Sequence, residues 1–536
     1  MKLQQDLQKM MEEYIAFVLE TSDKIKLFFQ KRVSPFLSHS FEYLLFQISP
    51  YWHHLFYYIL VSLLGYISLK GTNQRYYSPP SSSSSSLSSS YNAKKPFYDK
   101  KHHNLDLLFT AVSATTISSM STIEMENFSN PQLMVIIILM FSGGEVFLSL
   151  LGLQIRKLKH KKRARTHVLD PRPVSQEEGM KYKSLRVLNH LVLGYLLVFH
   201  IIGYSLLSLY ISVESSAGNV LTRKKLELHL FSIFTTVSTF SNCGFIPTNE
   251  NMIVFKRNSG LLLILIPQIL LGNKLYPCGL RLVIWVLERF TKKQEYSYLL
   301  KNHKGLGYGL LTSNYKAVLL GITSIGLVVV QFVVFSILEW NSLVLEGLSF
   351  YQKFVGSLFQ TVNSRHSGES IIDVSQVSPA TMLLFVVMMY LPSQTTFVPI
   401  RYDKESTIII EEKSSQGSKR QKSALIENLK FSPLSYLAIS IMLICITESR
   451  LLREDPLNFS VFNIIVEVVS AYGNVGFSMG YSCKQRLETN KPCEDRYFGF
   501  AGRWSWQGKF ILILVMLFGR LKRFHFNSGK AWKLSL

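Results

Sequence analysis

The chain has 536 residues, of which 48% are hydrophobic and only 17% charged, and its formal net charge is +23. Soluble proteins usually carry about a quarter charged residues, so this composition argues against a soluble fold and predicts long segments that face lipid. The basic residues cluster beside apolar segments, which argues against a nucleic-acid partner and favours anchors at the cytoplasmic face of a lipid bilayer.

Long apolar segments recur along the chain, after a polar, amphipathic stretch at 1–50 that we expect to be cytoplasmic. A helix needs roughly 20 apolar residues to cross about 30 Å of hydrocarbon. We therefore predict an all-α integral membrane protein with eight transmembrane helices, near 52–69, 131–155, 187–213, 260–288, 316–340, 379–400, 433–449 and 509–524.

A shorter segment of intermediate hydrophobicity follows the first, third, fifth and seventh span, at 105–125, 226–250, 350–370 and 463–482. Each is too short to span and ends in a turn of small residues, which predicts a re-entrant loop, because non-helical backbone at membrane depth must be buried in protein or line a water-filled cavity. The predicted unit is membrane helix, pore loop, membrane helix, repeated four times around one pseudo-fourfold pore. The candidate turn positions are Ser121, Gly244, Gly368 and Gly476.

The expected organisation places both termini in the cytoplasm, because the spans would return in pairs and the run 156–165 is strongly basic. The expected segments are these: a cytoplasmic segment 1–50, repeat A at 51–155 with an external Ser-rich linker at 78–90, a basic cytoplasmic loop at 156–186, repeat B at 187–289, a cytoplasmic loop at 290–315, repeat C at 316–400, a charged cytoplasmic loop at 401–431, repeat D at 432–524 and a cytoplasmic tail at 525–536.

Four such loops around one axis favour a cation. Each half-helix directs the partial negative charge of its C-terminal end at the centre, and main-chain carbonyl oxygens can replace the hydration shell of an ion. Glycine at the turn permits a positive φ and leaves no Cβ in a narrow path. Glu124 and Glu369 come just after two of the turns, so we expect them at the pore mouth, where they would concentrate cations; they could also be ordinary solvated loop carboxylates.

Cys483 and Cys493 lie in a polar loop that this topology puts outside the cell. An oxidising exterior makes a disulfide between them plausible, and two free thiols are the alternative.

The stretches "VSTFSNCGF", "NSRHSGE", "SAYGNVGFS" and "FAGRWS" resemble the plant HKT branch of the Trk/Ktr/HKT cation transporter family, and the resemblance extends from about residue 50 to the end of the chain. It implies a selectivity filter at Ser121, Gly244, Gly368 and Gly476, flanked by the backbone of Met120, Cys243, Ser367 and Val475. Members with serine in the first loop are similar to sodium-selective uniporters, whereas those with four glycines also pass potassium or couple the two ions.

The resemblance therefore implies a sodium-selective, channel-like passive transporter in the plasma membrane of a plant, serving sodium retrieval and salt tolerance. The alternative is a potassium-permeable transporter or a sodium–potassium symporter of the same fold. Relatives are dimers, so a homodimer is expected.

Two basic residues fall within predicted spans. Arg520, in "MLFGRL", resembles an arginine that relatives place below the filter, although Lys522 and Arg523 follow it and it could instead begin a cytoplasmic anchor. Lys274, in "GNKLYPCG", departs from relatives, which have a small or uncharged residue there. A lysine within a span must snorkel, pair or face water, so Lys274 would either weaken sodium entry from the internal cavity or be harmless.

No nucleophile, metal-ligand or nucleotide-binding constellation appears in the sequence. We therefore expect no enzymatic activity, no cofactor and no metal beyond transported sodium. A purely structural role would not require four loops with small residues at matched positions.

Overall fold

A computed structural model of the protein describes residues 50–72, 100–166, 176–303, 305–391, 433–486 and 493–525. The chain divides into two compact units, residues 1–57 and residues 58–536, and the fold described below is that of the second unit. The Ser-rich linker at 78–90 and the charged loop at 401–431 lie outside the described residues. So do the segment 1–50 and the tail 525–536, apart from one residue at the edge of each.

The regular structure within the described residues is helical. The α-helices are α3 (Pro50–Gly71), α4 (Lys100–Thr115), α5 (Asn130–Gly143), α6 (Glu145–Thr166), α7 (Gln176–Val213), α8 (Ser215–Lys224), α9 (Leu228–Ser241), α10 (Ser259–Gly272), α11 (Tyr276–Thr291), α12 (Gln294–Lys301), α13 (Asn314–Glu339), α14 (Phe350–Asn363), α15 (Pro379–Tyr390), α18 (Pro433–Thr447), α19 (Ser449–Glu454), α20 (Val461–Gly473) and α21 (Trp506–His525).

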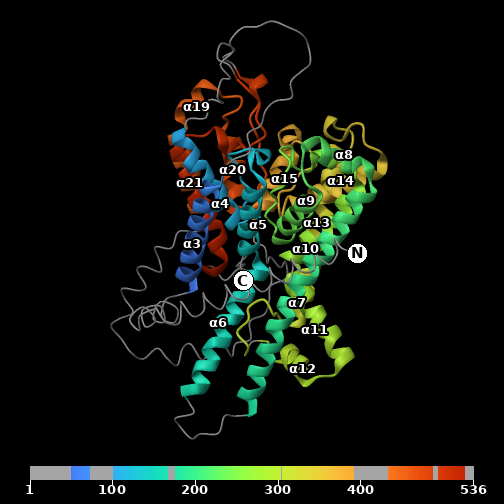
Figure 1. Ribbon diagram of the computed structural model, residues 1–536. Helices are drawn as coiled ribbons and strands as arrows, with labels where there is room; N and C mark the ends of the chain where they lie inside the picture. Colours follow the sequence, from blue (N-terminus) through green and yellow to red (C-terminus); the bar gives the residue numbers. More distant parts are fainter. Residues whose placement is uncertain are drawn as a thin grey trace, which may run out of the picture. The chain divides into compact units, whose positions relative to one another are not determined.

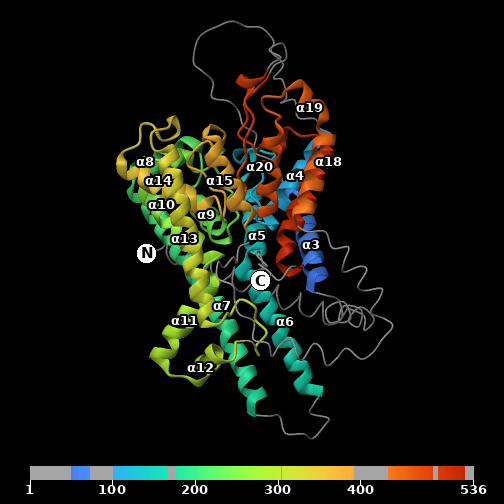
Figure 2. The ribbon, with the colours of Figure 1, turned by 180° about the vertical axis from the view of Figure 1, so that it is seen from behind.

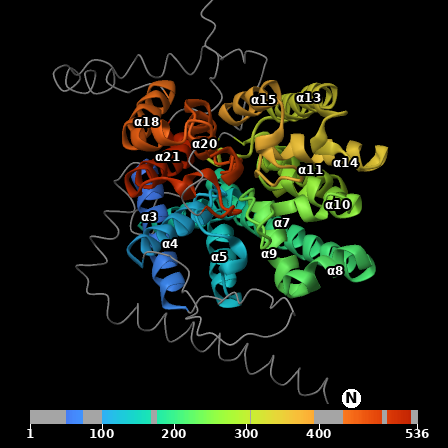
Figure 3. The same ribbon diagram turned by 90° about the horizontal axis from the view of Figure 1, so that it is seen from above.

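Four short helices, α4, α9, α14 and α20, correspond to the predicted half-helices, and they pack in a cycle. A group is one of the four predicted repeats, with its short helix and the helices before and after it. Helix α5 contacts α4 of its own group and also α9, the short helix of the next group. Helix α10 likewise contacts α9 and α14, α13 contacts both α14 and α15, and α15 contacts α20. The cycle closes because α21 contacts both α20 and α4. Seen from above, the groups follow one another in sequence order around a common centre (Figure 3).

The ends of the short helices are set by local chemistry. Helix α14 begins with a capping box in which Ser349 and Gln352 satisfy each other's backbone N–H groups, and Ser460 accepts from the N–H of Asn463 at the start of α20. Helices α9 and α20 each end at an asparagine in the left-handed conformation, Asn242 with φ 57° and Asn474 with φ 53°. Asparagine tolerates this conformation better than most residues, so the chain leaves both helices in the same direction.

Within the part of the chain that the structure describes, three helices are long and apolar enough to cross a membrane: Trp52–Gly71, Gly179–Val213 and Asn314–Glu339. The predicted second and fourth spans are instead broken, with α5 and α6 meeting at 59° and α10 and α11 at 86°. Gly144 is extended at the first break, and Asn273 leaves the helical conformation at the second. Pro277 near the start of α11 lacks the N–H that would continue α10.

The three remaining predicted spans contain helices that do not meet the same criterion. Helix α15 has 12 residues and α18 has 15, and α21 carries Lys509, Arg520, Lys522 and Arg523. Of the eight transmembrane helices that the sequence predicts, three meet this criterion in the described residues, or five if each bent pair counts as one span.

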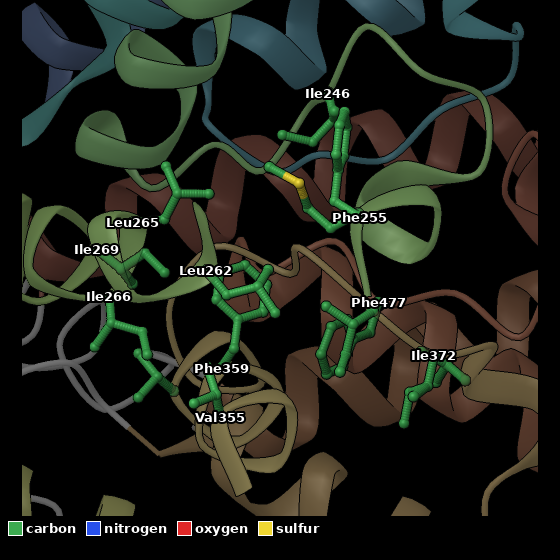
Figure 4. Close-up of a cluster of buried hydrophobic side chains, with 14 of the residues drawn as sticks. Ile246, Phe255, Leu262, Leu265, Ile266, Ile269, Val355, Phe359, Ile372 and Phe477 are labelled. Carbon is green, nitrogen blue, oxygen red and sulfur yellow. The ribbon is translucent and has the colours of Figure 1, made fainter. Parts of the chain in front are cut away.

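Apolar side chains from distant segments fill the space between the second, third and fourth groups. Phe255 and Leu262 pack with Phe359 of α14 and with Phe477, which follows α20 (Figure 4). Helix α13 has a row of exposed apolar residues on its other side, among them Val318, Ile322, Ile325, Val329 and Ile337. Helices α6, α7, α11 and α12 continue beyond the packed centre at one end (Figures 1 and 2), which is called the inner side below.

Candidate functional site

The loops that follow α9, α14 and α20 meet through three glycines with positive φ: Gly244 at 90°, Gly368 at 71° and Gly476 at 106°. Each glycine lies against main chain of another loop. A Cβ on Gly244 would overlap the carbonyl oxygen of Ser367, and a Cβ on Gly368 would overlap that of Val475. Only glycine fits at these positions, because both the backbone conformation and the space exclude a side chain.

Gly244, Gly368 and Gly476 are three positions of a ring in which each loop lies against the next. The fourth ring position is Ser119, and not Ser121 as the sequence analysis predicts. Ser119 has a positive φ of 54°. A Cβ on Gly476 would overlap the Ser119 side chain and lie 3.0 Å from the carbonyl oxygen of Ser118, and a Cβ on Gly244 would lie 3.2 Å from Ser119 Oγ. The Ser119 side chain therefore lies between two ring glycines, whereas Ser121 is two residues beyond them.

Spacing within the loops supports this alignment. A serine stands six residues before three of the four ring positions: Ser113, Ser238 and Ser470. The N–H of Gly244 donates to Ser238 Oγ at 3.0 Å, and the N–H of Gly476 donates to Ser470 Oγ at 3.0 Å. In the first loop, Ser113 stands six residues before Ser119, whereas it is not six residues before Ser121. This six-residue spacing is a signal that the sequence contained and that the prediction missed.

Three further glycines, on the inner side, support the same alignment of Ser119 with the ring glycines. Each lies so close to the end of a short helix that a Cβ would overlap a carbonyl oxygen: Gly143 against Thr115, Gly272 against Phe240, and Gly519 against Tyr472. Each of these carbonyls belongs to the residue four positions before a ring residue. Thr115 is thereby matched with Ser119.

The residues that precede the ring positions are Ser118, Cys243, Ser367 and Val475, so Met120 does not belong to this set. Met120 is instead buried in the cluster around α20 and α21. Ser121 has a different task, since its carbonyl oxygen and its hydroxyl both accept from the N–H of Gly499, at 3.0 and 3.2 Å. Ser121 thus ties the first loop to the fourth.

The two acidic residues predicted at the mouth have different surroundings. Glu369 is fully buried and accepts a hydrogen bond of 2.6 Å from Thr239 Oγ1. It holds the third loop to helix α9 and is not a solvated carboxylate, because its side chain is buried and hydrogen-bonded to Thr239. Glu124 is partly exposed; it accepts from the N–H of Tyr497 at 3.2 Å and lies 3.6 Å from Arg496.

A second ionic contact joins the first and second loops on the outer side. Lys224 Nζ donates to Glu126 at 2.8 Å and to Glu250 at 2.6 Å, and Glu126 also accepts from the N–H of Asn249. Burial works against the charge of Lys224, but the hydrogen bonds and charges of the two glutamates outweigh it and raise the pKa of Lys224. The sequence analysis did not identify this contact.

Basic residues lie on the inner side of the ring. Arg520 is buried and donates to Tyr58 Oη at 2.9 Å and to the carbonyl oxygen of Gly143 at 2.6 Å. Lys522 donates to the carbonyl oxygen of Tyr472 at 2.9 Å and lies 3.8 Å from the centre of the Tyr472 ring. These contacts place Arg520 inside the protein and not in a solvated anchor.

Lys274 lies just beyond the break at Asn273 and is also buried. Its ammonium donates to the carbonyl oxygen of Arg365, in the segment between α14 and Gly368. Lys274 therefore connects the second group to the third loop, on the inner side of the ring.

Cys483 and Cys493 are joined by a disulfide with a Cα–Cα distance of 5.8 Å. The N–H of Cys483 donates to Asp495 Oδ1 at 2.7 Å, and Arg503 stacks at 4.7 Å on the ring of Tyr481. The disulfide thus belongs to the part of the fourth loop that also contacts Glu124.

The ring brings together main-chain oxygens and the C-terminal ends of four short helices, without a carboxylate at any ring position. Each helix end carries roughly half a negative charge, and carbonyl oxygens suit hard monovalent cations. Among the described residues, no group of three or more His, Cys, Asp or Glu side chains could hold a metal ion. The arrangement can therefore bind a cation transiently through backbone oxygens.

Known proteins resemble the chain over most of its length. Residues 72–524 match the family model TrkH, described as "Cation transport protein". The chain is 48% identical over 464 residues to "Sodium transporter HKT1" of Arabidopsis thaliana, covering 82% of this chain and 90% of that protein. It is 46% identical over 460 residues to "Cation transporter HKT1;3" of Oryza sativa subsp. japonica, covering 80% and 85%. The crystal structure of the potassium transporter TrkH from Vibrio parahaemolyticus aligns with 78% of this chain and 76% of its own, at 13% identity and a TM-score of 0.43.

Proposed function

The chain belongs to the plant HKT branch of the Trk/Ktr/HKT cation transporter family, and on that premise we propose that it is a sodium-selective, channel-like uniporter. Membership makes it a multi-pass membrane protein that transports cations and is not an enzyme. The proposal concerns which cation passes, by what mode, and through which residues.

Ser119 is the observation that carries the proposal of sodium selectivity. It is the one ring position with a side chain, and that side chain lies between Gly244 and Gly476. A Cβ and a hydroxyl narrow the ring at this point, and they restrain the backbone more than glycine would. Potassium, the larger ion, then loses good coordination by the ring, whereas sodium can keep part of its water and still be held.

The proposed arrangement in the membrane is four units of membrane helix, pore loop and membrane helix, with eight passages in total. The packing cycle of α4, α5, α9, α10, α14, α15, α20 and α21, in which α13 links α14 to α15, supports it. Helices α5 with α6 and α10 with α11 would each make one bent passage. The disulfide between Cys483 and Cys493 supports placing that end outside the cell, which leaves both termini in the cytoplasm.

Transport would be passive and would occur at the plasma membrane. Sodium that enters the cell gains about 2.3 kcal/mol per 100 mV of inside-negative potential, which is sufficient to drive flux without ATP. We further propose a homodimer, with no cofactor, that serves sodium retrieval and salt tolerance.

The test is two-electrode current in oocytes that express the protein, bathed in sodium or in potassium. We expect the reversal potential to follow external sodium and to change little with potassium. A reversal potential that follows potassium equally would support the alternative of a potassium-permeable transporter, and sodium currents that require potassium would support a symporter. Surface-expressed protein without cation current would contradict the proposal as a whole.

A further inference from the structure

The side chain of Lys274 makes a hydrogen bond to which the proposed function assigns no role. The side chain begins beyond the helix break at Asn273, where Gly272 already lies against the carbonyl oxygen of Phe240 at the end of α9. From there it crosses to the next loop and donates to the carbonyl oxygen of Arg365. The break thus delivers an ammonium group to the inner side of the ring, between the second and third loops.

The acceptor of this hydrogen bond lies in the segment that leads into the ring. Arg365 stands three residues before Gly368, in the segment that turns from the C-terminal end of α14 into the ring. Carbonyl oxygens at such an end carry partial negative charge and favour a cation.

Lys274 does not act in isolation. Lys522, on the opposite side of the cycle, binds the carbonyl oxygen of Tyr472 at the end of α20. Two lysines from two different groups therefore bind carbonyl oxygens at the inner ends of two short helices.

We propose that Lys274 is a conductance-determining residue whose ammonium acts as a tethered cation, competing with the transported ion for the carbonyl oxygen of Arg365. This inference rests on the proposed function as a cation uniporter. The tethered ammonium fills an inner coordination site and repels an ion that leaves the ring. Lys274 would thereby limit the unitary sodium current without changing which cation the ring prefers, because selectivity belongs to Ser119 and the glycines.

The test is unitary current in excised patches, comparing wild type with Lys274→Met and Lys274→Arg. Methionine keeps the length and apolar volume of the side chain but removes the charge and the donor, so we expect a unitary sodium conductance roughly threefold to tenfold higher. Arginine keeps a cationic donor and should leave the conductance near that of wild type. The sodium-to-potassium permeability ratio should stay unchanged in both variants.

Lys293→Met is the matched control, because it removes one lysine from an exposed position near the end of α11 and should change nothing. A Lys274→Met channel with the conductance of wild type would overturn the inference while leaving the uniporter proposal intact. Absence of sodium current in wild type would instead contradict the proposed function.

A cysteine variant keeps the inference testable if methionine impairs delivery to the surface. Lys274→Cys should conduct more than wild type, and modification with a positively charged methanethiosulfonate should reduce its current again, whereas a neutral methanethiosulfonate of similar size should not. Wild type treated with both reagents controls for Cys243, Cys278 and Cys445. Equal effects of the charged and the neutral reagent would contradict a role for the charge.

Discussion

Gly476 lies directly against the side chain of Ser119, so that the only hydroxyl in the ring is held by a glycine 357 residues further along the chain. The contact explains why one position can carry a side chain while its neighbour cannot. Ser119 occupies the space that a Cβ on Gly476 would need. A ring of this kind can accept one serine, and the size and conformation of that serine then affect every ion that passes.

Replacing Ser119 by glycine should reduce discrimination against potassium. The change removes a Cβ from the ring and relieves a left-handed residue that costs about 1–2 kcal/mol when it is not glycine. We expect the potassium-to-sodium permeability ratio to rise roughly tenfold, since about 1.4 kcal/mol of lost discrimination corresponds to that factor. Reversal potentials in mixed solutions measure it.

Ser121→Gly is the matched control for that experiment. Ser121 lies outside the ring and accepts from Gly499 through its carbonyl oxygen as well as its hydroxyl, and the carbonyl contact is retained in glycine. The permeability ratio should therefore stay near that of wild type. If Ser121→Gly changed the ratio and Ser119→Gly did not, the assignment of the ring would be wrong.

Gly272→Ala should destabilise the protein, because the added methyl group would overlap the carbonyl oxygen of Phe240 at the end of α9. Relieving such an overlap typically costs about 1–3 kcal/mol, and here it would also displace the second loop. Gly326→Ala provides the comparison, since a Cβ there meets nothing within 4 Å in helix α13. Thermal unfolding of the purified proteins in detergent should show a lower Tm for the first variant and no loss for the second.

Lys224→Met should lower thermal stability by roughly 1–3 kcal/mol, because it leaves Glu126 and Glu250 without their shared cation. The pKa of Lys224 is raised in the folded protein, so its contribution is fully present below about pH 10.4, the ordinary value of a lysine, and is lost as the pH rises beyond the folded value. The Tm difference between wild type and variant should thus be constant at neutral pH and shrink above about pH 10.5. Arg223→Met, at an exposed neighbouring position, should show no such difference.

Cys483→Ser and Cys493→Ser should each release one thiol and loosen the fourth loop. A disulfide that closes a short loop contributes about 2–4 kcal/mol, so the Tm of both variants should fall. Maleimide labelling of the denatured protein checks the pairing, since Cys243, Cys278 and Cys445 should react without reductant and two more thiols only after reduction. Five reactive thiols before reduction would show that the disulfide does not form.

The sequence by itself indicated the class of protein and most of the ring. A segment that crosses the hydrocarbon core of a bilayer must be long, apolar and poor in charged residues. These properties can be read from the sequence without a structure. Gly244, Gly368 and Gly476 were also predicted correctly as turn positions, because a positive φ favours glycine locally. The helix breaks at Gly144 and Asn273 were not predicted, since a bent helix pair and a straight span have similar composition.

Only the tertiary structure decided what lies at the ring and around it. In the run from Ser113 to Ser121 several hydroxyl residues have similar local preferences, so composition could not distinguish Ser119 from Ser121, and the six-residue spacing from Ser113 indicates Ser119 only once it is compared with the other loops. The distinction comes from Gly244 and Gly476, which meet Ser119 across more than 100 residues of chain.

The prediction misplaced Glu369 at the mouth for the same reason, since its surroundings depend on Thr239 of another group. The carbonyl oxygen of Arg365, which accepts from Lys274, also belongs to another group, so this contact could not be predicted from the residues around Lys274. Backbone conformation is a local property that residue type reveals, whereas the partner of a buried polar group depends on how distant segments pack.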